Sequence, residues 1–271
     1  MEIYNSNADL SRRAVTYNLQ GLSFREFLNF ENDLNLEPVI LEEILRNHQD
    51  ISGSIVAQIK ILPEFKKYLE YGYYPFYKEG LKVYPIRLQN VVNTILENDL
   101  PAVENIEYNT VYKIKKMLMI IASLVPFSPN IAKLSAEIET NRANTVRYLD
   151  YLQKAGLTIN LLSSKKGISL MNKPDKVYLD NTNLQYALSL SGVNEGNLRE
   201  TFFANQIKAL HHLRTSQQGD FVVNDKYTFE VGGVNKRFDQ IKNIKDSFVV
   251  TDNTETGFGN RIPLWLFGLM Y

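Results

Sequence analysis

The chain has 271 residues, and its 30 lysines and arginines balance its 30 aspartates and glutamates, so the formal net charge is zero. This length favours two or three domains, and the 44% apolar and 22% charged shares are those of an ordinary globular protein. The absence of cysteine excludes disulfides, thiolate zinc sites and cysteine nucleophiles.

The first 31 residues contain a predicted strand and the start of a helix. Residues 15–19 alternate apolar and polar side chains, which is typical of a strand. Glu26 follows Ser23 at the spacing of a capping box, so we expect a helix to begin there. A strand this early has no nearby partner, and we interpret it as the last strand of a sheet whose other strands lie elsewhere.

Residues 32–108 are predicted to be mostly helical, with a further helix near 84–97 and a connector over 101–109. An aromatic cluster occupies residues 68–77. Such a cluster could stack nucleic-acid bases, but packing in a core or between domains is the commoner use of aromatic side chains at this density.

Residues 109–180 follow the order of a winged helix-turn-helix. An apolar helix over 110–124 precedes a helix over 131–138, a turn at 139–141 and a second helix that ends at a glycine cap. Val146, Leu149 and Leu152 form the predicted buried stripe of that last helix, extended by Thr145. Asn144, Arg147 and Tyr151 project from the opposite face, where arginine and asparagine can contact purine edges in a major groove.

Two strands at 157–162 and 176–179 are predicted to form the wing, with Lys165 and Lys166 at its tip. Residues 109–180 hold nine lysines and two arginines against five acidic residues, a surplus of six positive charges. This surplus suits phosphate contact, so double-stranded DNA is one expected partner. Winged helices also serve as protein-interaction modules, and Asp150 beside the exposed face weakens the electrostatic argument, so packing between domains is the alternative.

Six segments carry a resemblance that covers essentially the whole chain: DLSRRA at 9–14, LQGLSFREFL at 19–28, YGYYP at 71–75, GNLRETF at 196–202, FEVGG at 229–233 and IPLWLFG at 262–268. In this order they resemble bacterial and archaeal AAA+-like ATPases that end in a helical lid, a winged helix and a restriction-endonuclease-like domain of undefined function. The resemblance implies an ATPase-core remnant over 1–31, a helical lid over 32–108, the winged helix over 109–180 and the endonuclease-like domain over 181–271.

In such ATPases the segment similar to Ser11-Arg12-Arg13 supplies an arginine that senses the γ-phosphate, commonly across a subunit boundary. The resemblance implies this role for Arg13, with Arg12 and a plain surface salt bridge as alternatives. No G-x-x-x-x-G-K-[ST] loop occurs, so we expect no ATP hydrolysis by this chain alone. We expect ATP as a cofactor only when the chain is combined with a complete ATPase core. The chain is then a fragment or a degenerate product of a truncated gene, and its expected protein partner is an ATPase core or another copy of itself.

The C-terminal region is predicted to begin with a helix over 196–213, which carries His211 and His212 as a partly exposed pair. Strands follow at 220–223, 227–231 and 247–250, and Asn224-Asp225 provides a hairpin turn between the first two. With a further helix before the last strand, this order is that of an endonuclease-like core.

In an active enzyme of that type, an acid on the helix, an aspartate at the first strand and a Glu-x-Lys on the next strand hold Mg²⁺ and activate water. Glu200, Asp220 and Glu230 occupy these three positions, and Asp220 and Glu230 would bind Mg²⁺ if the site is active. Gly232 occupies the lysine position, although Lys236 could reach in from the next turn. The missing lysine favours a structural or binding role over catalysis.

We therefore predict an α+β multidomain protein with a mainly helical N-terminal half, a winged helix-turn-helix and a small α/β endonuclease-like domain. The leading hypothesis is a non-catalytic downstream part of an AAA+-like ATPase that binds DNA or protein, and its rivals are a metal-dependent nuclease and a protein-interaction adaptor. We expect a cytoplasmic protein with no membrane partner, because no apolar run is long enough to cross a bilayer and no targeting segment is evident.

Overall fold

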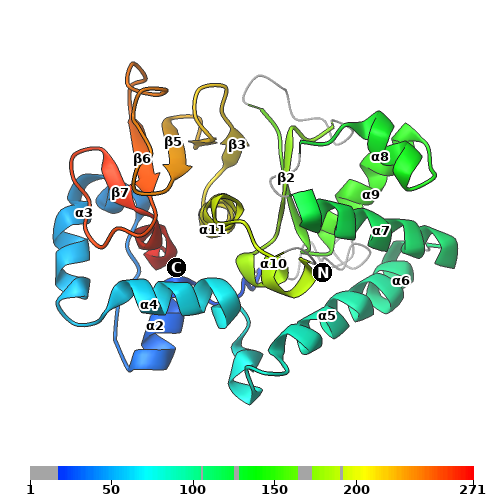
Figure 1. The fold of residues 1–271 in the computed structure, drawn as a ribbon, viewed down its shortest axis with the longest axis horizontal. Coiled ribbons are helices and arrows are strands. Elements are labelled where there is room, and N and C mark those ends of the chain that lie inside the picture. Colours follow the sequence, from blue (N-terminus) through cyan, green and yellow to red (C-terminus); the bar gives the residue numbers. More distant parts are fainter. Residues whose placement is uncertain (1–17, 105, 125–127, 164–172, 190–191) are drawn as a thin grey trace, which may run out of the picture.

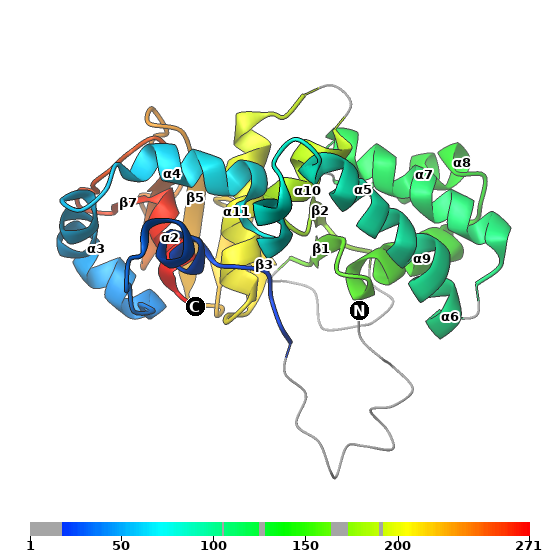
Figure 2. The ribbon, with the colours of Figure 1, turned by 90° about the horizontal axis from the view of Figure 1, so that it is seen from below.

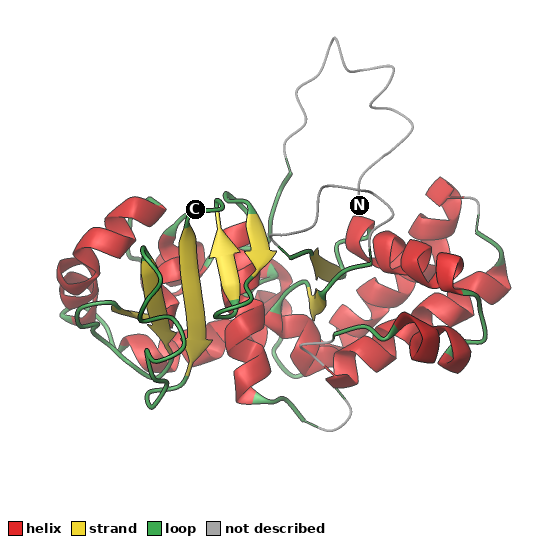
Figure 3. Ribbon diagram, turned by 90° about the horizontal axis from the view of Figure 1, so that it is seen from above, coloured by secondary structure: helices red, strands yellow, loops and turns green. Residues whose placement is uncertain are grey.

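The computed structural model describes residues 18–104, 106–124, 128–163, 173–189 and 192–271, and its fold is α+β (Figure 1). Two groups of elements lie on either side of helix α10 (Thr182–Leu188). One group contains a five-stranded sheet, and the other contains helices and a two-stranded sheet, which lies on the side of this group that faces the five-stranded sheet (Figure 3). Helix α10 contacts both groups, so it joins them at the middle of the molecule.

The five-stranded sheet has the order β3-β4-β5-β6-β7. Strands β3, β4 and β5 are antiparallel neighbours, whereas β5, β6 and β7 run parallel. The hairpin between β4 and β5 turns over residues 224–226, where Asn224 and Asp225 have positive φ angles of 54° and 53° and the Lys226 N–H donates to the Val223 carbonyl oxygen at 3.0 Å. The predicted hairpin is therefore confirmed. The strands are β3 (Leu213–Thr215), β4 (Phe221–Val223), β5 (Tyr227–Gly232), β6 (Ser247–Thr251) and β7 (Arg261–Pro263).

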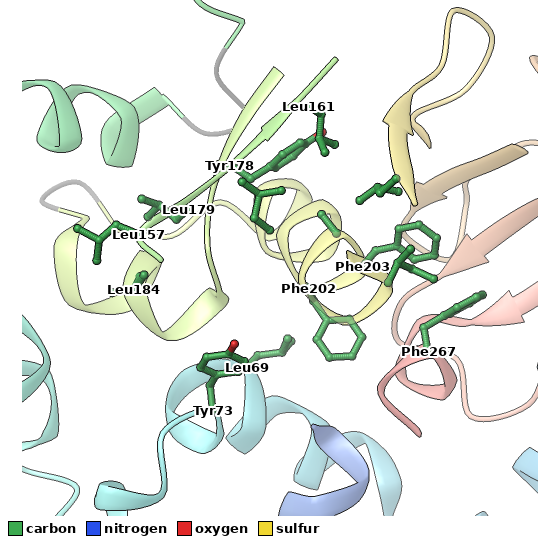
Figure 4. Packing of buried hydrophobic residues seen from close by; sticks show 14 of the residues in the cluster. Leu69, Tyr73, Leu157, Leu161, Tyr178, Leu179, Leu184, Phe202, Phe203 and Phe267 are labelled. Atoms are coloured by element: carbon green, nitrogen blue, oxygen red, sulfur yellow. The ribbon is translucent and has the colours of Figure 1, made fainter. Parts of the chain in front are cut away.

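Helix α11 (Glu195–Lys208) packs against this sheet, and the first described helices pack around the last segment of the chain (Figure 2). The first helices are α2 (Phe24–Asn32), α3 (Leu41–Val56) and α4 (Ile61–Lys67), and the last segment is the 3₁₀ helix η4 (Leu264–Leu269). Phe65 and Phe202 pack edge to face at 4.8 Å between ring centres, and Phe203 and Phe267 do so at 5.0 Å (Figure 4). Segments from both ends of the described chain therefore share one core.

Helix α2 begins at the predicted capping box. Ser23 Oγ accepts the Glu26 backbone N–H at 3.1 Å, and the Ser23 N–H donates to Glu26 Oε2 at 2.9 Å. Ser23 Oγ and Arg25 Nε also donate to the carbonyl oxygen of Tyr271, at 2.5 and 2.8 Å. The start of α2 is thereby fixed to the C-terminal segment.

After α4 the chain makes a π-helical turn, η1 (Tyr68–Gly72), and then the 3₁₀ turn η2 (Pro75–Glu79). The amide of Asn183 in α10 binds η1 directly. Its Nδ2 donates to the carbonyl oxygens of Tyr68 and Leu69, and its Oδ1 accepts the Tyr73 N–H and the Tyr84 hydroxyl. Three of these partners are backbone groups of the π-helical turn or of the residue that follows it. Buried tyrosines here confirm that the aromatic cluster packs in the core.

The second group contains the remaining helices and a two-stranded antiparallel sheet. Asn130 and Asn141 cap the starts of α8 and α9 by accepting backbone N–H groups at 3.1 and 2.8 Å. Leu149 and Leu152 are buried as predicted, while Val146 is half-buried beside a fully buried Thr145. The elements are α5 (Tyr84–Thr94), η3 (Ile95–Asp99), α6 (Leu100–Glu104), α7 (Tyr108–Leu124), α8 (Ile131–Glu137), α9 (Arg142–Lys154), β1 (Thr158–Leu161) and β2 (Lys176–Leu179).

The two sheets are neighbours. The Thr215 N–H donates to the Leu162 carbonyl oxygen at 3.0 Å, and Ser163 forms an isolated parallel bridge with Thr215. The hairpin of β1 and β2 therefore adjoins the β3 edge of the five-stranded sheet, and residues of the hairpin come within reach of α11.

One predicted element and several predicted boundaries are wrong. The helix expected before the last strand of the endonuclease-like core is not formed, because residues 233–246 connect β5 to β6 through turns and bends. The helix expected over 196–213 ends at Lys208, because the chain turns and enters β3; Leu210 is 55% exposed, and the histidine pair lies in the turn. The connector expected over 101–109 is largely helical, since α6 extends to residue 104 and α7 starts at 108. Of the strand expected at 15–19, Asn18 and Leu19 are not in a strand and the rest lies outside the described residues.

None of the helices in the described part of the chain combines the length and the apolar composition that a bilayer crossing requires.

Candidate functional sites

The three predicted acidic residues lie at one junction of α11 with the five-stranded sheet. Glu200 comes from the middle of α11, Asp220 precedes β4 by one residue, and Glu230 lies within β5. Gly219 has a φ of 111°, and a Cβ there would stand 3.1 Å from the Phe229 carbonyl oxygen. This glycine lets the chain approach β5 closely and so positions Asp220.

Glu200 is held by two side chains of the β1–β2 hairpin. The Tyr178 hydroxyl donates to Glu200 Oε2 at 2.7 Å, and Lys176 Nζ lies 3.3 Å from the same oxygen. Lys176 Nζ also lies 3.7 Å from Asp220 Oδ1. Lys176 and Tyr178 are two residues apart on one strand, so they share a face of β2. One lysine therefore bridges two of the three carboxylates.

Asp220 is further fixed by the backbone of β5. Its Oδ2 accepts the Val231 N–H at 2.9 Å, and its own N–H donates to the Phe229 carbonyl oxygen at 2.9 Å. The carboxylate thus caps the edge of the β4–β5 hairpin as well as contacting Lys176.

Glu230 is almost fully buried and pairs with Lys236, whose Nζ lies 2.5 Å from Oε1. Lys236 reaches Glu230 across Gly232, because this glycine has no side chain. A Cβ at Gly232 would stand 2.6 Å from the Lys236 side chain and would block it. The suggestion that Lys236 reaches in from the next turn is therefore confirmed. The second oxygen of Glu230, Oε2, is buried without a hydrogen-bond partner in the described structure.

The surroundings of Glu200 and Glu230 disfavour the charged forms of these two side chains. Burial raises the pKa of Glu200 above its ordinary value, Asp220 adds to the effect, and Lys176 and Tyr178 oppose it. Burial likewise raises the pKa of Glu230, against the opposing hydrogen bond from Lys236, and both Asp220 and Glu200 contribute to the rise. The three carboxylates are thus electrically coupled.

The arrangement does not fit a bound Mg²⁺. In the part of the chain that the structure describes, no group of three or more His, Asp or Glu side chains is arranged to hold a metal ion. The carboxylate oxygens that a hard cation would need are instead directed to Lys176, Lys236, Tyr178 and a backbone N–H. The cluster is neutralised in large part by the protein's own ammonium groups.

The predicted recognition face of α9 is divided. Arg147 is exposed, and Asn144 is half-buried with its Nδ2 3.4 Å from Thr140 Oγ1. Tyr151 instead packs against the core and lies beside Tyr148, and burial raises its pKa. At the end of the helix, Lys154 pairs with Asp150 at 2.8 Å and with Glu104 of α6 at 3.8 Å. Only the first half of this face is open.

Sequence reasoning missed three residues at these sites. Arg142 begins α9, is exposed, and could have been inferred from its place beside the Asn141 cap. Lys176 and Tyr178 were assigned only to a wing strand, because their partners lie on α11 and β4 and no local pattern connects them. Of the other predicted residues, Arg12, Arg13, Lys165 and Lys166 lie outside the described residues.

Comparison with known proteins gives a family without an assigned activity. Residues 62–195 match a family described as a domain of unknown function (DUF8612). This region runs from α4 to the first residue of α11, so it includes Lys176 and Tyr178 but none of the three carboxylates. The chain is also similar to an uncharacterized protein of Methanocaldococcus jannaschii, with 28% identity over 158 residues. The match covers 56% of this chain and 33% of that relative. No solved structure matches the chain.

Proposed function

We propose that this chain is the downstream part of an AAA+-like ATPase, and that its α7–β2 segment is a winged helix that contacts double-stranded DNA. The order of helix, helix, turn, helix and hairpin supports this assignment, as do the asparagine caps that set the turn before α9. The expected absence of ATP hydrolysis follows from the missing phosphate loop. An ATPase core or a second copy remains the proposed protein partner, with Arg13 or Arg12 contributing to a nucleotide site there.

One observation carries the DNA-binding proposal. The first half of α9 presents Arg142 and Arg147 as exposed side chains without an acidic partner among the described residues, with Asn144 between them. The first residues of a recognition helix are those that contact base edges and phosphates. The second half, where Lys154 is paired and Tyr151 is packed, serves instead to fix α9 against α6 and the core.

The test is binding of a fluorescent random-sequence duplex, followed by anisotropy over a series of salt concentrations. We expect salt-dependent binding, and the variant Arg142→Ala/Arg147→Ala should weaken it and reduce the slope of log affinity against log salt by about 2, since each phosphate-contacting charge contributes about 1. Arg46→Ala removes an exposed arginine from α3, outside the proposed winged helix, and is the control; it should leave the affinity and the salt slope unchanged.

Two results would decide against DNA contact through α9. Equal affinity and equal salt slope for the wild-type protein and the double variant would show that another surface binds the duplex. No binding at low ionic strength would favour the protein-interaction adaptor.

We further propose that the carboxylate cluster is structural. Two observations support this role. Lys176 bridges Glu200 and Asp220, and the described residues contain no group of side chains that could hold a metal ion. We expect no nicking of supercoiled plasmid in the presence of Mn²⁺ or Mg²⁺. Nicking that disappears in Glu230→Ala would establish the rival nuclease function, and nicking that persists in that variant would indicate a contaminant.

A further inference from the structure

The segment between β6 and β7 displays a phenylalanine to solvent. Phe258 is 80% exposed, and Gly257 and Gly259 flank it. The Phe258 N–H donates to the Arg261 carbonyl oxygen at 3.0 Å, and the Arg261 N–H donates back to the Phe258 carbonyl oxygen at 3.0 Å. These two hydrogen bonds close a two-residue turn. We call residues 257–261 the Phe258 turn, and it lies beside α3 (Figure 1).

The Phe258 turn is held in place by α3 and by its own glycines. The buried His48 Nε2 donates to the Gly259 carbonyl oxygen at 3.0 Å, and Gln49 Nε2 donates to the Gly257 carbonyl oxygen at 3.3 Å. A Cβ at Gly257 would stand 2.3 Å from a carbonyl oxygen of the same turn, so only glycine fits there. The exposed ring is therefore presented in one arrangement before any contact forms, which lowers the entropy cost of binding.

The surface beside α2 contains a hollow with apolar walls. Its volume is about 440 Å³. Phe30 is 54% exposed, and Pro75 is also exposed. A cavity of about 150 Å³ is enough for a benzene ring, so this hollow has room for the side chain of a phenylalanine. We call it the α2 hollow, and the residues that line it are Leu22, Arg25, Glu26, Asn29, Phe30 and Pro75.

The polar side chains that line the α2 hollow already have partners within the protein. Arg25 donates to the carbonyl oxygens of Tyr271 and Leu36 at 2.8 and 3.0 Å. Asn29 exchanges two hydrogen bonds with the backbone of Leu36, and Glu26 Oε2 accepts the N–H of the residue that caps α2. The hollow therefore suits an apolar side chain better than a polar small molecule, which would need free donors and acceptors.

The Phe258 turn and the α2 hollow also carry opposite charges at their edges. Glu255 is exposed and precedes Phe258 by three residues. The Lys78 side chain is 45% exposed, and its Nζ lies 4.8 Å from the centre of the Phe30 ring. An acidic edge on one surface and an ammonium group on the other favour their approach and fix its direction.

We propose that the α2 hollow of one copy of this chain receives the Phe258 ring of a second copy. The contact joins two different surfaces, so it is heterologous, and each copy contributes a ring to one neighbour and a hollow to another. It names the surfaces through which a second copy binds. The proposal is independent of DNA binding, because neither surface includes α9.

The experiment measures self-association by sedimentation velocity over a series of protein concentrations, without DNA. We expect the weight-average sedimentation coefficient of the wild-type protein to rise with concentration. Phe258→Ser removes the ring, and Phe30→Asp places a charge in the wall of the hollow. Each variant should weaken self-association at least tenfold, because burying a phenylalanine side chain contributes a factor of about ten or more to a binding constant.

Mixing the two variants tests the pairing of the two surfaces. Phe258→Ser keeps an intact hollow and Phe30→Asp keeps an intact ring, so fluorescently labelled Phe30→Asp should form a one-to-one complex with Phe258→Ser. Tyr108→Ser removes a side chain that is 87% exposed on α7 and is the control, which should associate like the wild type. Near-ultraviolet circular dichroism checks that each variant is folded, and Pro75→Glu replaces Phe30→Asp if that variant is not.

Three results would overturn the proposal. A wild-type protein that stays monomeric at every concentration has no such contact. Self-association that is unchanged in folded Phe258→Ser would place the contact elsewhere. Two folded variants that each lose self-association but do not bind one another would show that the ring and the hollow are not partners. Duplex binding measured by anisotropy is a separate readout, so failure of either proposal leaves the other standing.

Discussion

Glu200 is a carboxylate whose surroundings favour its proton. Burial raises its pKa above the ordinary value of 4.5, so between that value and the higher folded-state pKa the folded protein binds more protons than the unfolded chain. Protonation of Glu200 therefore raises the free energy of unfolding as the pH falls through this window. This contribution is lost as the pH rises through the folded-state pKa. Glu200→Gln, a neutral near-isostere, should raise the Tm at neutral pH and flatten its dependence on pH above 4.5.

Thermal unfolding over a pH series measures this effect, and Glu200→Ala is its control. The alanine removes the acceptor of the buried Tyr178 hydroxyl as well as the charge, so it should lower the Tm at every pH. A glutamine variant less stable than the wild type at neutral pH would show that the ion pair with Lys176 outweighs the burial of the charge.

At the scale of elements, the turn η1 depends on one side chain from α10. Asn183→Ala would remove one hydrogen bond each from the Tyr68 and Leu69 carbonyl oxygens, the Tyr73 N–H and the Tyr84 hydroxyl. We expect a loss of about 3 kcal/mol in the free energy of unfolding, measured with urea, because four buried hydrogen bonds are lost at once and each contributes a net of about 0.5–1.5 kcal/mol. Asn90→Ala, on the exposed face of α5, is the control and should change the free energy by less than about 0.5 kcal/mol. Equal effects of the two substitutions would contradict this role.

Elements fixed by local chemistry could be predicted from the sequence. The Ser23–Glu26 box starts α2, and Asn224 and Asp225 turn the β4–β5 hairpin, because these effects act within a few residues. The π-helical form of η1 could not be foreseen, since Asn183 lies over a hundred residues away. Strands β3 and β7 have three residues each, too few for an alternating pattern to appear.

The candidate site shows the same division. The three acidic residues were predicted from their positions on a helix and two strands. Lys236 was predicted because it lies close to Gly232 along the chain. Lys176 could not be predicted, because its role depends on how the β1–β2 hairpin lies against α11. Contacts between residues far apart in the sequence hold the hairpin there, among them the hydrogen bond of the Thr215 N–H with the Leu162 carbonyl oxygen. Long-range placement of this kind leaves no periodic signal in the sequence.

At the scale of the whole molecule, most of the buried hydrophobic residues that the structure describes belong to one cluster, whose members extend from Phe24 to Met270. Helix α2 and the C-terminal η4 close this cluster together, and Gly268 is the point where they touch: a Cβ there would stand 2.5 Å from Phe24 Cβ. The segment expected as a remnant of an ATPase core therefore contributes to the same core as the last segment of the chain.

Two glycine substitutions test this joint closure. Gly268→Ala should lower the free energy of unfolding by about 1–3 kcal/mol, because the added methyl group must separate α2 from η4. Gly53→Ala, on the exposed face of α3 with no atom within 4 Å of its Cβ position, should instead raise it by about 0.5–1 kcal/mol, because alanine loses less backbone entropy in a helix. Urea denaturation compares both with the wild type. If α2 packed only loosely on η4, Gly268→Ala would be neutral, and the two ends of the described chain would be energetically independent.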